Sequence, residues 1–283
     1  MTTLLVGFDS AWTPTNAGAI VGVLRRTDGS YRELGMPETV TYGDAARTLL
    51  RWQAEESPRT TIVLLDQPTI VRNSSGQRPV ENIVASPVSL RFGGVQPANT
   101  SKHEMFGVEA PVWGFLSSFG GVPDPLQAGT GTRVLETYPV LAMIALDWTL
   151  PHGRATGRLP KYNPERRKTF LIADWQHVCA RVADSLEARG LVRLAGWSAA
   201  AGRNPKPRKL DQDGVDACLC LLVALHLVEQ RDCLMVGNTG SGYIVVPHGQ
   251  ALSAELDARC VATGRRTADW VRTFQLGLVA SPL

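Results

Sequence analysis

The stretch "TLLVGFDSAW" at residues 3–12 places an acidic residue, Asp9, at the end of a short and continuous apolar run. Such a run is typical of a strand that is buried on both faces of a sheet, as in α/β proteins. A carboxylate that ends a core strand belongs either to a surface turn or to a functional site. The positions of the other carboxylates along the chain bear on this choice.

The composition is that of a globular enzyme. The 283 residues are 44% hydrophobic and 19% charged, which suits one large α/β domain with a full core. The net charge of +3 is too small to predict nucleic-acid binding by itself. No apolar run is long enough for a membrane helix, and the five cysteines include no CxxC pair. We therefore expect a cytoplasmic protein with reduced thiols and no membrane association.

The first third of the chain predicts strands and one helix in alternation. "AGAIVGVLRR" and "SYRELGM" flank "TDGS", and an Asp-Gly turn between two strand-like runs favours a hairpin. "YGDAARTLLRWQAEE" has apolar residues at near-helical spacing, and "TTIVLLDQP" is another buried strand that ends at Asp66. Residues 72–131 are then rich in Gly, Pro, Ser and Asn. Because so long a loop is unusual inside a compact domain, we interpret 72–131 as an insertion with short helices over a site, within a single domain covering 1–283.

The remaining elements follow from similar patterns. "TRVLETYP" predicts a fifth strand that ends near Glu136, and "VLAMIALDWTL" predicts a short helix. A further helix is expected over 163–190, with Asn163 as its cap, Pro164 in its first turn and Gly190 at its end. "DQDGVDACLCLLVALHLVEQ" is apolar nearly all round, which indicates a buried helix. "SGYIVVP" is typical of a late strand or a packed extended tail.

Carboxylates recur at the ends of these core elements. Asp9, Asp66 and Glu136 end strands, while Asp213 and Asp216 are three residues apart at the head of the buried helix. In a parallel or mixed sheet, strand ends and helix starts converge at one edge, where sites form. Clustered carboxylates repel one another, and a hard divalent cation such as Mg²⁺ or Mn²⁺ removes the conflict. Two such ions about 4 Å apart support phosphodiester cleavage.

Each carboxylate also has a purely structural explanation. Asp9 and Asp66 are also typical of turns, and Glu136 of an ion pair or a helix start. Asp213 and Asp216 resemble a capping pattern that stabilises a helix start whatever the function. The joint pattern carries more weight than any single residue, because all five lie at the ends of elements.

Two basic clusters are candidates for phosphate binding. "KYNPERRK" contains Lys161 and Arg166, and "RNPKPRKLD" contains Lys206, Arg208 and Lys209 just before the late helix. A solvated helix face and a solvated linker are the structural alternatives. Trp12 follows Asp9 closely and is a candidate for stacking on a base, with burial in the core as the alternative. No His pairs with Cys or His at metal spacing, which disfavours zinc.

Taken in order, the motifs "VGFDSAW", "LLDQP", "LETYP", "KYNPERR" and "DGVDACLCLLVAL" resemble those of a known family. It is a widespread bacterial and archaeal domain family of unknown function, predicted to consist of RNase H-like nucleases. The resemblance runs from about residue 3 to about residue 247 and ends in "GYIVVP".

The resemblance implies an RNase H-like fold: a mixed five-stranded sheet flanked by helices, with strands one to three antiparallel and the long insertion after strand four. The site layout is similar to that of the Holliday junction resolvase branch, where acids on strand one, strand four and a late helix hold the metals. That layout implies Asp9, Asp66, Asp213 and Asp216 as metal ligands here. Glu136 matches the family's own E-x-Y-P element, and we include it among the candidate catalytic residues.

Three functions remain open from the sequence. The leading one is a Mg²⁺- or Mn²⁺-dependent nuclease that uses a two-metal carboxylate site and has nucleic acid as its partner. The second is an ATP-binding protein of the sugar kinase and actin-like group, although the first Gly after Asp9 is Gly18, beyond the turn where phosphates would bind. The third is a non-catalytic binding protein with this fold. A homodimer is compatible with the first, but the sequence identifies no interface, and DNA and RNA are not distinguished.

Overall fold

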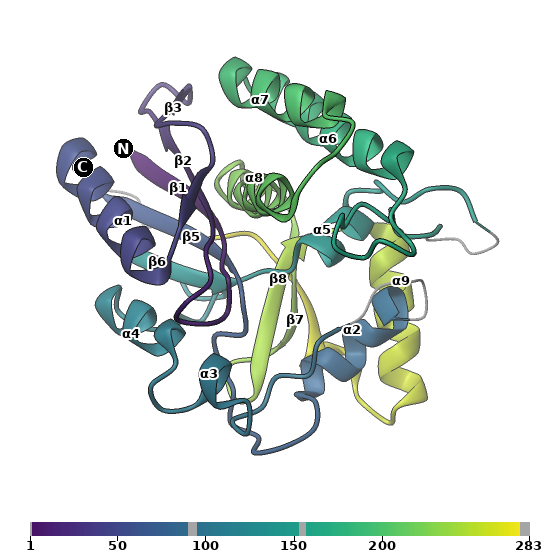
Figure 1. Cartoon of the computed structure of the whole chain (residues 1–283). Coiled ribbons are helices and arrows are strands. Elements are labelled where there is room, and N and C mark those ends of the chain that lie inside the picture. The colour runs from purple at the N-terminus through teal and green to yellow at the C-terminus, as the bar shows by residue number, and fades with distance from the viewer. Residues whose placement is uncertain (1, 90–94, 153–156, 278–283) are drawn as a thin grey trace.

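The computed structural model describes residues 2–89, 95–152 and 157–277 (Figure 1). Within this part of the chain, six strands form the main sheet. They are β1 (Thr3–Asp9), β2 (Gly18–Arg25), β3 (Tyr31–Glu33), β4 (Glu38–Val40), β5 (Thr60–Asp66) and β6 (Gly131–Glu136). The strand order is β3-β2-β1-β5-β6, and β4 pairs with β2 beside β3.

The directions of the strands agree with the expected topology. β1 pairs antiparallel with β2, and β2 pairs antiparallel with β3. β5 and β6 run parallel to β1, which places their carboxyl ends at one edge of the sheet. This mixed five-strand order with flanking helices is consistent with an RNase H-like fold, as the sequence predicted. The short strand β4 is an addition that the sequence pattern did not indicate.

Ten helices lie within the described residues. They are α1 (Tyr42–Glu56), α2 (Pro79–Ser89), α3 (His103–Phe106), α4 (Pro111–Ser118), α5 (Pro139–Ala145), α6 (Ile172–Glu187), α7 (Val192–Arg203), α8 (Lys209–Val228), α9 (Gln250–Ala262) and α10 (Thr267–Trp270). Figure 1 shows α1 and α8 on opposite sides of the main sheet. Alternate residues of β1 therefore face two apolar cores: Phe8 packs in the core that includes α1 and α4, and Leu5 in the core that includes α8. This explains the continuous apolar run that the sequence shows.

Helix α8 approaches the sheet most closely at Gly7 in β1. A Cβ atom at this position would lie 2.0 Å from the backbone oxygen of Ala217 and 2.5 Å from the backbone nitrogen of Leu221. Real Cβ atoms do not come this close, so the helix and the strand pack backbone against backbone here. The absence of a side chain at Gly7 thus fixes how deeply α8 sits on the end of the strand that carries Asp9.

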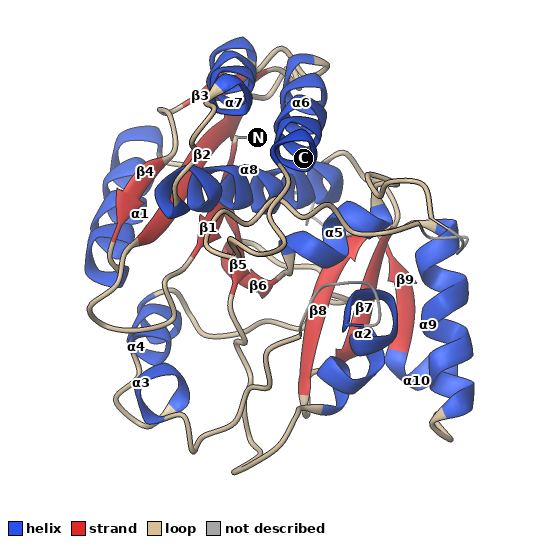
Figure 2. Cartoon of the chain, turned by 45° about the vertical axis from the view of Figure 1, so that its right-hand side comes forward, coloured by secondary structure: helices blue, strands red, loops and turns tan. Residues whose placement is uncertain are grey.

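A second sheet stands beside the first (Figure 2). Its described strands are β7 (Cys233–Asn238), β8 (Gly242–Pro247) and β9 (Val271–Phe274), in the order β8-β7-β9. The expected late strand at 241–247 corresponds to β8, whereas β7 and β9 were not anticipated. Residues of β7 and β8 share one apolar core cluster with residues of β1, β5 and α8.

The predicted start of the helix over 163–190 is wrong. The Asn163 side chain accepts a hydrogen bond from the backbone N–H of Glu165 at 2.9 Å, which closes a turn, and α6 begins only at Ile172. The Leu171 N–H donates to the Lys161 carbonyl at 2.9 Å, so the segment between them is a closed loop. Arg166 therefore projects from a loop and not from a helix face.

The insertion expected at 72–131 contains α2, α3 and α4, and its residues 90–94 lie outside the described part of the chain. Within the described residues, no helix combines the length and the apolar composition that a membrane crossing requires.

Candidate active site

Two carboxylates meet where neighbouring strands end. Asp9 and Asp66 are direct partners in the parallel register of β1 and β5, and each is the last residue of its strand. Their carboxyl groups are close enough for the charge of Asp66 to raise the pKa of Asp9. Two neighbouring carboxylates repel each other unless they share a proton or a cation lies between them.

Helix α8 brings more polar groups to the same edge. Lys209, the adjacent residues Gln212 and Asp213, and Asp216 recur at intervals of three to four residues, so they lie on one face of the helix. All four line a single open cavity of about 720 Å³, together with Asp9, Asp66, Trp12 and Arg166. The structure thus places four of the five candidate acids around one cavity.

Asp216 is held by two neighbours. The Tyr162 hydroxyl donates to Oδ1 of Asp216 at 2.7 Å, and Nε2 of Gln212 donates to Oδ2 at 2.9 Å. Burial nevertheless raises the pKa of Asp216 to about 6, because the hydrogen bonds and Lys209 only partly offset the loss of water. The other end of the Gln212 amide, Oε1, is buried and has no hydrogen-bond partner among the described residues.

Burial also dominates the electrostatics of the strand-end pair. It raises the pKa of Asp9 well above the ordinary value, and the charges of Asp216, Asp66 and Asp213 raise it further. The pKa of Asp66 is raised for the same first reason, followed by the charge of Asp216. Lys209 counteracts both shifts, and its ammonium group is paired with Asp213. The cavity therefore contains more negative charge than the one lysine neutralises.

This donor set suits a hard divalent cation in its chemistry. All the acidic groups are oxygen donors, which Mg²⁺ and Mn²⁺ prefer. Among the described residues, however, no three His, Cys, Asp or Glu side chains are grouped so that they could hold a metal ion together. Mg²⁺ is commonly bound by one or two carboxylates, with waters and substrate phosphate completing its shell. The Asp9–Asp66 pair fits such an open site, while Asp213 and Asp216 are engaged by protein partners.

The predicted basic residues separate into two groups. Lys209 belongs to the first turn of α8 and lines the acid cavity, and Arg166 lines the same cavity from the loop before α6. Lys161 lines a smaller adjoining cavity with Tyr162 and Arg166. Lys206 and Arg208 are exposed and are absent from the described lining of the acid cavity. The Arg208 backbone N–H instead donates to Asp211, at the start of α8.

The capping role considered for the two helix acids falls to another residue. Helix α8 begins at Lys209 with Arg208 as its N-cap, and the side chain of Asp211, the third helical residue, accepts a hydrogen bond from the Arg208 N–H. Asp213 and Asp216 are therefore not the helix cap, and both are buried with their carboxylates toward the cavity.

Trp12 is fixed beside Asp66. Its indole Nε1 donates to the Asp66 carbonyl at 2.9 Å, and its ring meets Phe106 edge-on at a centroid distance of 5.7 Å. Its backbone has a φ of 63°, a left-handed conformation that costs energy in a residue with a side chain. Trp12 is only partly buried and lines the acid cavity as well as a neighbouring one.

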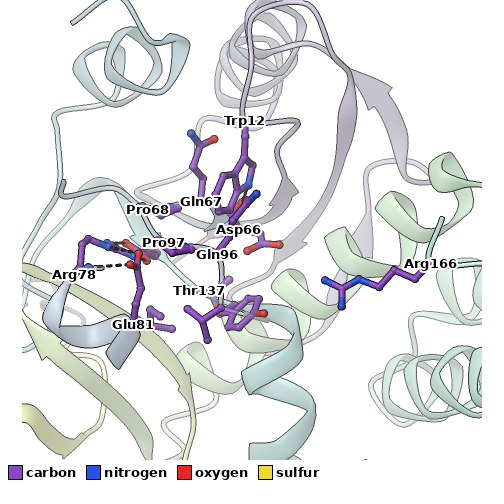
Figure 3. A pocket seen from close by; sticks show the side chains of 14 residues that line it. Trp12, Asp66, Gln67, Pro68, Arg78, Glu81, Gln96, Pro97, Thr137 and Arg166 are labelled. Atoms are coloured by element: carbon purple, nitrogen blue, oxygen red, sulfur yellow. Dashed lines mark hydrogen bonds and ion pairs between the residues drawn. The ribbon is translucent and has the colours of Figure 1, made fainter. Parts of the chain in front are cut away.

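Glu136 lines a second cavity, which adjoins the acid cavity, and it is paired with Arg78. Nη2 of Arg78 donates to Oε1 of Glu136 at 2.6 Å, and Nη1 donates to Oε2 at 2.9 Å. Nε of Arg78 donates to Glu81 at 2.8 Å, and the Thr69 N–H donates to Glu136 at 2.9 Å. Burial raises the pKa of Glu136, and Arg78 opposes this shift. Figure 3 shows the Arg78 and Glu81 pair at one wall of this cavity, with Asp66 and Arg166 across from it.

Sequence reasoning missed several of these partners. Tyr162 stands inside the "KYNPERR" motif, which was interpreted only for its charges. Gln212 precedes Asp216 by four residues, so helical spacing would have found it. Arg78 comes from the insertion, where no pattern pointed to a buried cation.

The sheet, the flanking helices and the acid-lined cavity define an α/β protein with an RNase H-like sheet. The chain belongs to the family described as "Protein of unknown function (DUF429)", whose model matches residues 7–239. The match spans most of the chain, as the sequence motifs led us to expect. Searches of curated proteins and of solved structures found no match to this chain.

Proposed function

We propose that the protein is a metal-dependent phosphodiesterase that acts on nucleic acid. One observation carries the proposal: Asp9, Asp66, Asp213 and Asp216, from two strands and one helix, line the same open cavity. Burial raises the pKa values of Asp9, Asp66 and Asp216, so ionising this group of acids costs free energy that a bound cation would offset, and their grouping points to a ligand that needs negative charge. Family membership alone assigns no activity.

The residues divide into two roles. Asp9 and Asp66 form the pair that would hold Mg²⁺ or Mn²⁺, and Asp216 with Asp213 would hold a second ion or orient the attacking water. Lys209 and Arg166 line the same cavity as cations and would bind the phosphate. A bound divalent cation supplies a polarised phosphate oxygen and an acidified water. Tyr162 and Gln212 keep the Asp216 carboxylate oriented through their hydrogen bonds.

We also propose that the protein binds nucleic acid and is located in the cytoplasm. Negatively charged phosphates complement Lys209 and Arg166 once the acids have bound their cation. The five cysteines, all in the described part of the chain, are buried free thiols, which suits a reducing compartment.

The first test is calorimetric titration of Mn²⁺ and Mg²⁺ into the wild type, Asp9→Asn and Asp216→Asn. We expect binding in the wild type and loss of most of the affinity in both variants, which would join β1 and α8 in one metal site. A broad screen of single-stranded, duplex and branched DNA and RNA follows for cleavage. Metal-dependent cleavage that Asp9→Asn retains in full would refute the assignment. Displacement of a dye-labelled ATP by ATP would favour the kinase-like alternative instead.

A further inference from the structure

We propose that the cavity beside the acid site binds one unpaired nucleobase of the substrate. The inference rests on the proposed function and names its substrate class: nucleic acid with a base that is single-stranded or turned out of its stack. The cavity has a volume of about 480 Å³, within the usual range for small-molecule sites. A single nucleotide fits in that space.

The two cavities adjoin each other. Trp12, Asp66, Gln96 and Arg166 line both of them. Arg166 reaches the shared region from the loop before α6 and faces Asp66 across the opening (Figure 3). A nucleotide whose phosphate lies between Arg166 and the acid pair therefore has the second cavity within reach of its base.

The walls of the second cavity suit a flat heterocycle. Pro68 and Pro97 come from two loops, Ile244 comes from β8, and Trp12 and Tyr138 add aromatic rings. The Trp12 ring cannot rotate freely, because its Nε1 is bonded to the Asp66 carbonyl and its edge packs on Phe106. A fixed aromatic ring beside proline and aliphatic side chains is a stacking surface that accepts any base.

The charges of the cavity favour a neutral group over a second phosphate. Among the described lining residues, its buried polar wall holds Arg78 bound between two carboxylates, Glu136 and Glu81. The wall therefore carries a net negative charge and would repel an anion. Among the described residues, Oε1 of Glu136 accepts a hydrogen bond from Arg78 alone, so a lone pair remains for an N–H donor. Bases present such donors on their edges.

A base in this cavity is separated from its neighbours by protein on several sides. The walls come from the loops after β1 and β5, from the insertion, from the segment after β6 and from β8. A stacked and paired base cannot enter such a space, so the nucleotide must be single-stranded or extruded. This geometry predicts that continuous duplex is a poor substrate.

The test compares ligands that differ only in the base. Mn²⁺-saturated wild type is titrated by calorimetry with 2′-deoxyadenosine 5′-monophosphate and with 2-deoxyribose 5-phosphate. We expect the nucleotide to bind at least about tenfold more tightly, the effect of one stacked base. Equal affinity for the two ligands, or no binding of the nucleotide, would overturn the proposal.

Two matched proline variants locate the binding. Pro97 is half-buried and lines the cavity, and Pro58 is half-buried before β5, at the other end of the strand from Asp66. Pro97→Trp should remove the tenfold preference for the nucleotide, and Pro58→Trp should keep it. If Pro97→Trp does not fold, Gln96→Trp at the exposed rim of the cavity takes its place. Retention of the preference in a folded cavity variant contradicts the site.

A metal-free measurement separates this inference from the proposed function. Saturation-transfer NMR with 2′-deoxyadenosine and 2-deoxyribose, without added metal, detects the base contact alone. Asp9→Asn should keep this signal even though it loses Mn²⁺ affinity. A base signal in a protein that binds no metal would refute the nuclease proposal and support the base site. Mn²⁺ binding without a base signal would refute the base site and leave the nuclease proposal standing.

Discussion

Asp9 and Asp66 lie directly opposite each other as the last residues of two adjacent parallel strands, and the charge of Asp66 raises the pKa of Asp9. The arrangement follows from the register of β1 and β5 and needs no contribution from a flexible loop. Asp9 is buried and Asp66 is half-buried, so the charge of the pair is poorly solvated. In the absence of a cation, the pair is a source of instability at neutral pH.

We expect Asp9→Asn to stabilise the metal-free protein. Because the pKa of Asp9 is raised, the folded state binds this proton more tightly than the unfolded state, and stability falls as pH rises above the ordinary Asp pKa. The neutral amide should therefore add about 1 to 3 kcal/mol at about pH 8, or a few degrees in melting temperature, and much less at about pH 4. Thermal unfolding at both pH values checks this. Saturating Mn²⁺ should raise the wild-type melting temperature and leave that of the variant nearly unchanged.

Lys209 and Lys206 form a natural pair of test and control. Both residues are exposed, but Lys209 lines the acid cavity and contacts Asp213, while Lys206 lies on the preceding loop outside the described lining. We expect Lys209→Met to reduce cleavage or nucleic-acid affinity by about tenfold or more, because a phosphate ligand inside the site is lost. Lys206→Met should change either quantity less than about threefold. Equal effects of the two substitutions would mean that only general positive charge matters.

Tyr162→Phe should move the pH dependence of metal binding. The Tyr162 hydroxyl stabilises the charged form of Asp216, whose pKa is raised to about 6. Without this hydrogen bond the pKa of Asp216 rises further, so higher pH is needed to ionise it. Mn²⁺ affinity measured across the range from about pH 5 to pH 8 should show its midpoint shifted upward in the variant. Tyr31→Phe, which removes a hydroxyl bonded to Glu229, should leave the midpoint in place.

The buried ion pair between Arg78 and Glu136 predicts a stability effect. Arg78 is 1% exposed, and Arg78→Met would leave Glu136 and Glu81 without their cation. We expect a loss of about 3 to 5 kcal/mol in unfolding free energy, measured by urea denaturation. Glu136→Gln should also lower stability but keep Mn²⁺ affinity within about threefold, because Glu136 lies outside the acid cavity. Loss of Mn²⁺ binding in a folded Glu136→Gln variant would instead support the catalytic role expected from the E-x-Y-P element.

Much of the fold could be predicted because its core strands have continuous apolar runs. Both faces of β1 are covered, so its sequence signals burial without ambiguity, and the Asp-Gly turn marked the first hairpin. The start of α6 could not be found in the same way. Asn163 and Pro164 are typical of a helix start, but here the Asn163 side chain closes an isolated turn. The small sheet of β7, β8 and β9 was only partly recognised, because β9 joins it from far along the chain.

The candidate site was predictable where backbone topology alone sets it. Parallel strands bring Asp9 and Asp66 to one edge whatever their side chains contact, and helical spacing places Asp213 and Asp216 on one face. Arg78 and Tyr162 are different, because both lie in irregular segments whose position depends on tertiary packing. No local pattern distinguishes a buried arginine in an insertion from a solvated one. For the same reason, the sequence predicts phosphate binding equally for Lys206 and Lys209, whereas in the structure only Lys209 of the two lines the acid cavity.

The close packing at Gly7 limits how this protein can change during evolution. Asp9 follows Gly7 on the strand, and Asp216 precedes the Ala217 backbone that Gly7 contacts. Even the smallest side chain at this position would push α8 away from β1 and separate the two acids. Glycine at this position is therefore required by the packing of the core helix as well as by the acid site. We expect related chains with this fold to keep glycine here even where their acids have been replaced.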